Sequence, residues 1–174
     1  MTAGSVMHMC VHSIDTFTDY SGRLLAWLTL GMALLTGFIV VLRYGFGIGS
    51  IPAQEAVIYM HGSLFLLGAA YALKVGAHVR VDIFYRNFNA RARAWVDSLG
   101  GIIFLLPLCG FILISSTDYV STSWAMRETS AEPGGIPAVF LLKSLIPLMA
   151  ITLALQAVAE VFRNALILTE SAEE

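Results

Sequence analysis

The side chains that could carry chemistry gather in one polar segment between two long apolar runs. This segment, GAHVRVDIFYRNFNARARA at residues 76 to 94, holds His78 and five charged residues. It could form a catalytic loop, a nucleic-acid patch, or a connection whose positive charge orients a membrane protein. The sequence contains no metal-ligand spacing, nucleophile elbow, phosphate-binding loop or dinucleotide fingerprint. The net charge of −2 and the scattered Lys and Arg residues also exclude nucleic acid as a partner.

His61 lies inside the second apolar run, where haem ligation is the chemistry it would suit. A haem held by two histidines of one chain needs a second histidine at similar depth on a facing helix, and the other three apolar runs contain none. A haem shared with another subunit stays open, and it would make the chain a membrane anchor of a respiratory enzyme. A hydrogen bond from His61 to a neighbouring helix is the simpler interpretation. We therefore predict no cofactor and no metal for the chain itself.

Charged residues stand at the ends of the apolar runs rather than in their middles. Four of them flank the second and third runs: Glu55, Lys74, Asp97 and Asp118. The Lys143 ammonium, near the start of the fourth run, could pair with an acidic residue, extend to the headgroups, or reach a partner's substrate path. The acidic candidates are Asp118, Glu128 and Glu132. A chain that transported alone would need polar groups at mid-membrane, so the sequence favours a subunit over a self-sufficient exporter.

The composition requires a membrane environment. Of 174 residues, 57% are hydrophobic and only 13% are charged, against roughly 25% charged in an average soluble domain. A soluble chain of this length would still leave roughly 30% of its surface wet, and so could not hide this much apolar area. The chain is therefore predicted to be an integral membrane protein.

Four apolar runs are long enough to cross a bilayer as helices of about 20 residues. The predicted spans are residues 24–43, 56–74, 97–118 and 137–161. The first run is longer than a signal-peptide core and has no cleavage site after it, so we expect it to stay in the mature protein. The predicted fold is an all-α membrane protein with one domain over residues 1–174.

The distribution of Lys and Arg predicts the orientation. Seven basic residues lie on the side that carries both termini: Arg23, Lys74, Arg80, Arg86, Arg91, Arg93 and Arg163. Three lie on the other side: Arg43, Arg127 and Lys143. Both termini are therefore predicted to be cytoplasmic, and the segment 76–94 is the strongest orientation signal.

Two shorter elements are predicted at the cytoplasmic surface. The first is a short N-terminal amphipathic helix that bends into the first span at Ser21 and Gly22, with a frayed polar tail as the alternative. The second is an interfacial segment between spans two and three, in which Val79, Ile83 and Phe84 recur at helical spacing. Asn89 is predicted to cap the helix that leads into span three.

Prolines mark other features of the spans. Pro137 is predicted to occupy the first turn of span four, where its missing N–H costs nothing. Pro107 and Pro147 lie inside spans three and four, and each is expected to bend its helix and free a carbonyl.

The order of several motifs around the spans resembles the DctQ-like small membrane subunit of tripartite ATP-independent periplasmic (TRAP) transporters. These motifs are GAHVRVD, NARARAWVD, SWAMRETSAEPGGIPAVFLLKSLIPL and LALQAVAEVFR, and the resemblance covers about residues 20 to 165. The most specific parts are the tract from His78 to Asp82 and the tract from Glu132 to Ala138 with Lys143. Many members have a proline just after the cap of span three, where this chain has Ala90.

The resemblance implies an inner-membrane scaffold subunit without catalytic activity. It would work with a large multi-span permease that moves an organic acid with sodium, and with a periplasmic solute-binding protein. Membrane lipids would be further partners. The resemblance implies that His78, Arg80 and Asp82 fix the cytoplasmic end of span two. Together with Arg91 and Arg93 they form the predicted structural and topology motif. Contacts of Arg80 with solvent or headgroups are the simpler alternative. Candidate periplasmic contacts with a partner are Trp124, Arg127, Glu128, Glu132 and Lys143.

Overall fold

The computed structural model describes residues 3–78, 85 and 88–170, and these residues are almost entirely helical. The elements in chain order are α1 (Ala3–Phe46), α2 (Ile51–Lys74), α4 (Ala90–Gly100), the π-helical turn η1 (Gly101–Leu105), α5 (Leu106–Ala125) and α6 (Val139–Glu170). Four helical rods are long and apolar enough to cross a membrane: Gly4–Phe46, Ile51–Lys74, Ala90–Ala125 and Val139–Thr169. The predicted all-α fold with four spans is confirmed.

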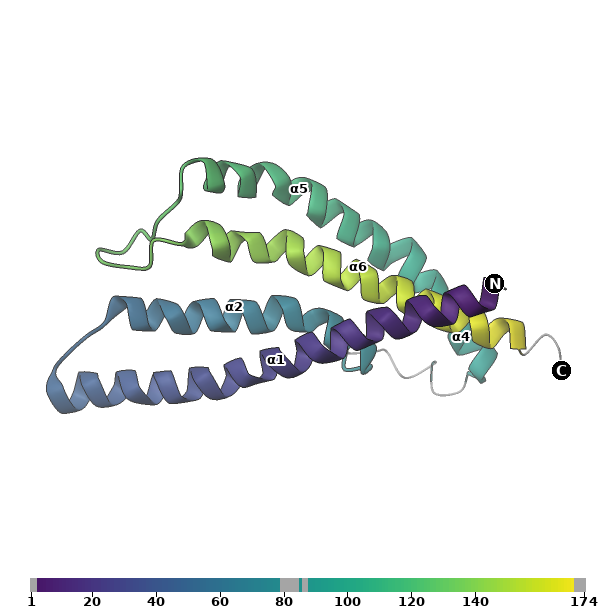
Figure 1. Ribbon diagram of the computed structural model, residues 1–174, viewed down its shortest axis with the longest axis horizontal. Helices are drawn as coiled ribbons and strands as arrows, with labels where there is room; N and C mark the ends of the chain where they lie inside the picture. The colour runs from purple at the N-terminus through teal and green to yellow at the C-terminus, as the bar shows by residue number, and fades with distance from the viewer. Residues whose placement is uncertain (1–2, 79–84, 86–87, 171–174) are drawn as a thin grey trace.

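α6 is the central helix of the bundle. It contacts α1, α2, α4, η1 and α5, whereas α1 and α2 form a hairpin on one side of it and α4 to α5 lie on the other (Figure 1). Its buried positions are mostly small, and Ala150, Ala157 and Ala159 are almost inaccessible. Small side chains let helices approach closely, and such packing holds helices together in a membrane where the hydrophobic effect does not.

The bundle has two distinct ends. At the terminal end, the first half of α1, the start of α4 and the last turns of α6 lie together (Figure 1). At the loop end lie the connections 47–50 and 126–138. The apolar part of the bundle between the two ends is bounded by basic residues. Arg23 and Arg43 on α1 are twenty residues apart, and so are Lys143 and Arg163 on α6. Twenty helical residues span about 30 Å, the thickness of the hydrocarbon core.

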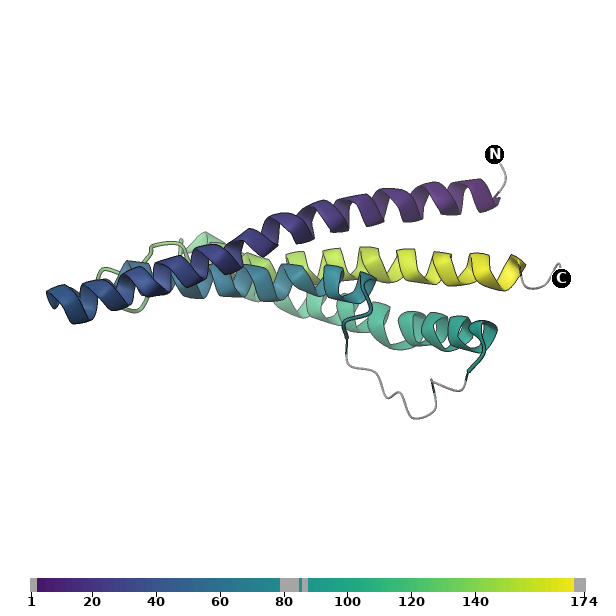
Figure 2. The same cartoon turned by 90° about the horizontal axis from the view of Figure 1, so that it is seen from below.

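α1 runs as one uninterrupted helix of 44 residues, so the predicted short N-terminal helix is the first part of α1 rather than a separate element, and the helix is not broken at Ser21 and Gly22 (Figure 2). The Ser21 hydroxyl donates within the helix to the Thr18 carbonyl at 3.1 Å. Gly22 is needed for close packing rather than for a turn, because a Cβ there would lie 2.5 Å from Cδ2 of Tyr71. The alternative of a frayed tail also fails, since the N-terminal part is helical from Ala3.

The third rod contains a single π turn immediately before Pro107. The Leu106 N–H donates to the Gly101 carbonyl, five residues back, at the point where Pro107 can offer no N–H of its own. A π turn beside a proline gives hydrogen-bond partners to backbone carbonyl groups that would otherwise have none. At the start of the rod, the Asn89 side chain accepts from the Ala92 N–H at 2.8 Å, which is the predicted cap.

Two further predictions concern the connections. α6 begins at Val139, so Pro137 lies just before its first turn rather than in it. The interfacial segment predicted around Val79, Ile83 and Phe84 falls outside the described residues, as do Arg80 and Asp82 of the predicted motif.

Candidate functional site

At the loop end, Glu55 fastens the long connection to α2. Its carboxylate accepts one hydrogen bond from the Ser130 hydroxyl and another from the Ile136 N–H at 2.5 Å. Gly135 makes room for this arrangement, because a Cβ there would lie 2.5 Å from the Ser130 Oγ and 2.7 Å from the Glu55 Oε1. Gly134 has a φ of +77°, which favours glycine. The two glycines thus let the connection fold back onto the start of α2.

Lys143 on α6 pairs with Glu128, one of its three acidic candidates. Its Nζ lies 2.5 Å from the Glu128 Oε2 and 4.0 Å from the centre of the Tyr119 ring. The buried Ser123 hydroxyl donates to the same carboxylate oxygen at 2.6 Å. The bonds from Lys143 and then Ser123 lower the pKa of the Glu128 carboxyl below its ordinary value. This cluster therefore joins α5, the connection and α6.

Trp124 and Arg127 close the loop end beside this cluster. The Trp124 Nε1 donates to the Ser144 hydroxyl at 2.7 Å, and its ring meets Phe140 edge-on at 4.7 Å between centroids. The Arg127 guanidinium lies over both rings, 5.7 Å from Trp124 and 5.5 Å from Phe140. Arg127 has a φ of +48°, an uncommon conformation for a residue other than glycine.

The structure brings together four of the five residues predicted for this end. Glu132 is the exception, because its exposed carboxylate has no partner among the described residues and only its backbone N–H bonds to Ser130, at 3.1 Å. Glu55 was predicted only as a charge that ends an apolar run. The closeness of the GGIP tract to α2 could not be read from the sequence, since 81 residues separate Glu55 from Ile136.

At the terminal end, a polar network ties α1 to α6. Gln156 is completely buried on α6, where its side chain accepts from the Thr18 hydroxyl at 2.7 Å and donates to Asp15 at 3.1 Å. Arg163 bridges Asp15 at 2.7 Å and Glu160 at 2.5 Å. Every member thus has a partner, as polar groups at a membrane depth require.

Lys74 extends this terminal network to α2. Its Nζ lies 2.7 Å from the Asp19 carboxylate and 3.1 Å from the Asp15 carbonyl oxygen. The sequence interpretation treated Lys74 and Arg163 only as orientation charges and did not identify Gln156. A glutamine followed by an acid at i+4 and an arginine three residues further on was the available signal in LQAVAEVFR.

Three residues of the predicted cytoplasmic motif lie within the described part of the chain: His78, Arg91 and Arg93. His78 is exposed after α2, and Arg91 is exposed on the first turn of α4. The Arg93 Nε donates to the Phe88 carbonyl at 3.0 Å, and its guanidinium lies 5.2 Å from the centre of the Tyr85 ring. The Tyr85 hydroxyl in turn donates to Asp97 at 2.7 Å. These contacts fix the entrance of the third rod.

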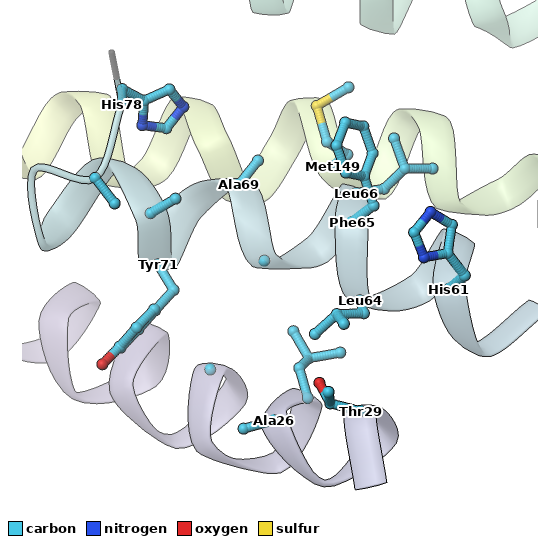
Figure 3. A pocket seen from close by; sticks show the side chains of 15 residues that line it. Ala26, Thr29, His61, Leu64, Phe65, Leu66, Ala69, Tyr71, His78 and Met149 are labelled. Carbon is cyan, nitrogen blue, oxygen red and sulfur yellow. The ribbon is translucent and has the colours of Figure 1, made fainter. Parts of the chain in front are cut away.

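An apolar groove of about 760 Å³ runs between α1 and α2. Its walls are mainly aliphatic and small residues, and His61 and His78 lie at its two ends (Figure 3). His61 is exposed, stacks on Phe65 at 6.3 Å between ring centres, and has no hydrogen-bond partner among the described residues. The predicted bond from His61 to a neighbouring helix of the chain is therefore wrong.

The polar residues described here hold helices together, and their arrangement offers no reaction centre. Within the described ranges, no group of three or more His, Cys, Asp and Glu residues could hold a metal ion. A carboxylate that acts as a general base must be within hydrogen-bond distance of the atom it deprotonates. The carboxylates of Glu55 and Glu128 instead form hydrogen bonds with other groups of the chain. The geometry defines a bundle of four membrane-spanning helices whose two ends are tied by polar contacts within the chain.

Comparison with known proteins identifies the class. The sequence matches the family described as "Tripartite ATP-independent periplasmic transporters, DctQ component" over residues 32–166. It is 30% identical over 107 residues to the "C4-dicarboxylate TRAP transporter small permease protein DctQ" of Vibrio cholerae serotype O1, a match that covers 61% of this chain and 46% of that protein. The chain thus spans about half the length of this relative. No solved structure matches the chain.

The chain belongs to the DctQ family of tripartite ATP-independent periplasmic transporters. It is a component of a transporter rather than an enzyme, and a multi-pass protein of the inner membrane. The resemblance inferred from the motifs is confirmed, and the respiratory-anchor alternative receives no support from these comparisons.

Proposed function

We propose that this chain is a static scaffold that holds the large permease subunit of a TRAP transporter in the membrane while the large subunit moves the substrate. The observation that carries the proposal is the placement of the polar contacts. The Glu55 and Glu128 clusters fasten one end of the bundle, the Gln156 and Arg163 network fastens the other, and the helices between them pack through small residues. A bundle tied at both ends resists the sliding that a transport element needs.

The proposed orientation places the terminal end in the cytoplasm and the loop end in the periplasm. The excess of Lys and Arg at the terminal end supports this orientation. The loop end would then face a periplasmic binding protein, and exposed Trp124, Arg127 and Glu132 are its proposed contacts. A reporter fused after Arg93 should be active only as a cytoplasmic fusion, and periplasmic activity would reverse the assignment.

The proposed substrate is an organic acid, and the proposed coupling ion is sodium. The name of the Vibrio cholerae relative refers to C4-dicarboxylates, which supports this substrate class for the assembly. The middle of each of the four spans carries no Lys or Arg, so substrate recognition would lie in the other two subunits.

Two measurements test the scaffold proposal. A tagged chain purified from its native membranes in mild detergent should recover a large permease of about twelve spans, identified by mass spectrometry. In liposomes with that permease, the binding protein and an imposed sodium gradient, succinate uptake should fall at least tenfold when this chain is omitted. Recovery of the chain as a homo-oligomer alone, or undiminished uptake without it, would overturn the proposal.

A further inference from the structure

The groove of about 760 Å³ between α1 and α2 lies at membrane depth. Along α2, its floor follows residues that recur every three or four positions: His61, Phe65, Gly68 and Ala72. This stripe is about 16 Å long, or three turns of helix. It meets little of the chain, because Phe65 is 72% exposed and no atom lies within 4 Å of a Cβ added at Gly68.

The His61 side chain in this groove needs a hydrogen-bond partner. It lies six residues beyond Glu55, which at 1.5 Å per residue places it about 9 Å inside the apolar length. A histidine side chain is too short to reach the headgroups from that depth, unlike Lys or Arg. Its ring nitrogens have no partner among the described residues, although polar side chains in a membrane almost always pair or face the interior of an assembly.

The rest of the groove suits a helix. Gly68, Ala69 and Ala72 leave space that would let a second backbone come close, and such small residues are typical of helix contacts in membranes. An acyl chain could fill the same space, but it could not accept or donate a hydrogen bond at His61. The molecule that fills the groove must therefore be apolar along its length and carry one hydrogen-bonding group at the depth of His61.

We propose that this groove seats a membrane-spanning helix of the large permease subunit, and that a hydroxyl, amide or carboxyl group of that helix hydrogen-bonds to His61. The inference rests on the proposed scaffold function and assigns its main contact surface. Phe65 would pack beside the incoming helix, and the small residues would set the close distance between the two backbones (Figure 3).

Site-specific photocrosslinking tests the occupant in the assembled transporter. Benzoylphenylalanine in place of Phe65 changes little else, and Phe104 offers a matched control outside the groove. The two side chains are 72% and 74% exposed, and each lies about 11 to 14 Å from the charged end of its span. Irradiation should join position 65 to the large permease at least tenfold more than position 104. Equal yields at the two positions, an adduct with a second copy of this chain, or an adduct with lipid alone would each overturn the proposal.

Two variants test the contact surface by recovery of the large subunit. Gly68→Leu should block the groove and reduce the recovered permease more than fivefold, whereas Gly37→Leu serves as its control, since Gly37 is equally open but lies outside the groove. His61→Phe keeps the size of the ring and should reduce recovery about threefold. Unchanged melting of each variant without the permease shows that the bundle itself is intact.

The outcomes separate this inference from the scaffold proposal. If the unaltered chain recovers no permease, the scaffold proposal fails. If the unaltered chain recovers it and Gly68→Leu does so equally well, only the groove assignment fails. If Gly68→Leu does not fold, the photocrosslinking yields decide, because they use a chain with an intact glycine.

Discussion

The two ends of the bundle are fastened by different means. At the loop end, the Glu55 carboxylate on α2 accepts hydrogen bonds from a hydroxyl and a backbone N–H of the glycine-rich connection. The path of this connection is therefore set by its own turn residues together with Glu55, which is distant in the sequence. At the terminal end, side chains of helices more than 130 residues apart bind one another, and no turn is involved. A fold-back loop tolerates little change in shape, whereas a side-chain network can lose one member and adjust.

From this difference we expect that a substitution that adds volume at the loop end lowers the free energy of unfolding more than the other substitutions discussed here. In Gly135→Ala, the new methyl group would meet Ser130 and Glu55 at distances that no relaxed structure allows. We expect a loss of about 2 kcal/mol in the free energy of unfolding, which is typical of an overpacked site. Thermal melting in detergent should show a clear decrease in Tm, and Gly49→Ala, in the other connection with open space around it, should show little change. Similar melting of both variants would show that the loop end adapts freely.

The terminal network should respond less strongly and in a coupled way. Gln156→Leu removes both the acceptor for Thr18 and a donor to Asp15, and we expect a loss of about 1 to 2 kcal/mol. Adding Thr18→Val should cost little more, because its hydroxyl has already lost its partner. A double-mutant cycle on chemical unfolding should then give a coupling of about 0.6 kcal/mol, the average for helix-to-helix hydrogen bonds in membranes, and at most about 1.7 kcal/mol. Strict additivity would mean that the Thr18 to Gln156 bond contributes nothing to stability.

The sequence was informative about the loop end and largely silent about the terminal end. Run lengths and charge positions predicted four spans, because these signals are local. Asp15 and Arg163 meet only through the packing of α1 on α6, and a single sequence carries no record of that contact. The continuity of α1 was missed for a related reason, since Gly22 serves a contact with Tyr71, which lies on another helix.

The groove is a second feature whose contacts the sequence did not predict. Sequence spacing placed His61 inside span two, and the chain's own bundle was expected to provide its partner. Instead, the ring lies on an outward face and has no hydrogen-bond partner among the described residues. A polar residue in a span can thus be satisfied within the bundle, as Gln156 is, or reserved for assembly, as we propose for His61.

The smallest expected effect is the response of the loop end to acid, which tests the ion pair between Glu128 and Lys143. The folded-state pKa of Glu128 lies below its ordinary value because Lys143 and Ser123 bond to the charged carboxylate. A lowered folded pKa means that the pair's stabilisation is fully present above the unfolded pKa, about 4.5, and is lost as the pH falls through the lower folded value. Glu128→Gln should therefore flatten the decrease in Tm between about pH 5 and pH 3.

Glu132 provides the control for this acid response. It is an exposed glutamate of the same connection whose carboxylate has no partner among the described residues, so Glu132→Gln should leave the slope of Tm against pH unchanged. If both substitutions flatten the slope equally, general charge at the loop end governs the response rather than the pair with Lys143. If only Glu128→Gln flattens it, the loop end is fastened by an ion pair that titrates. The hydrogen bond between Thr18 and Gln156 at the terminal end carries no such dependence, because neither side chain ionises.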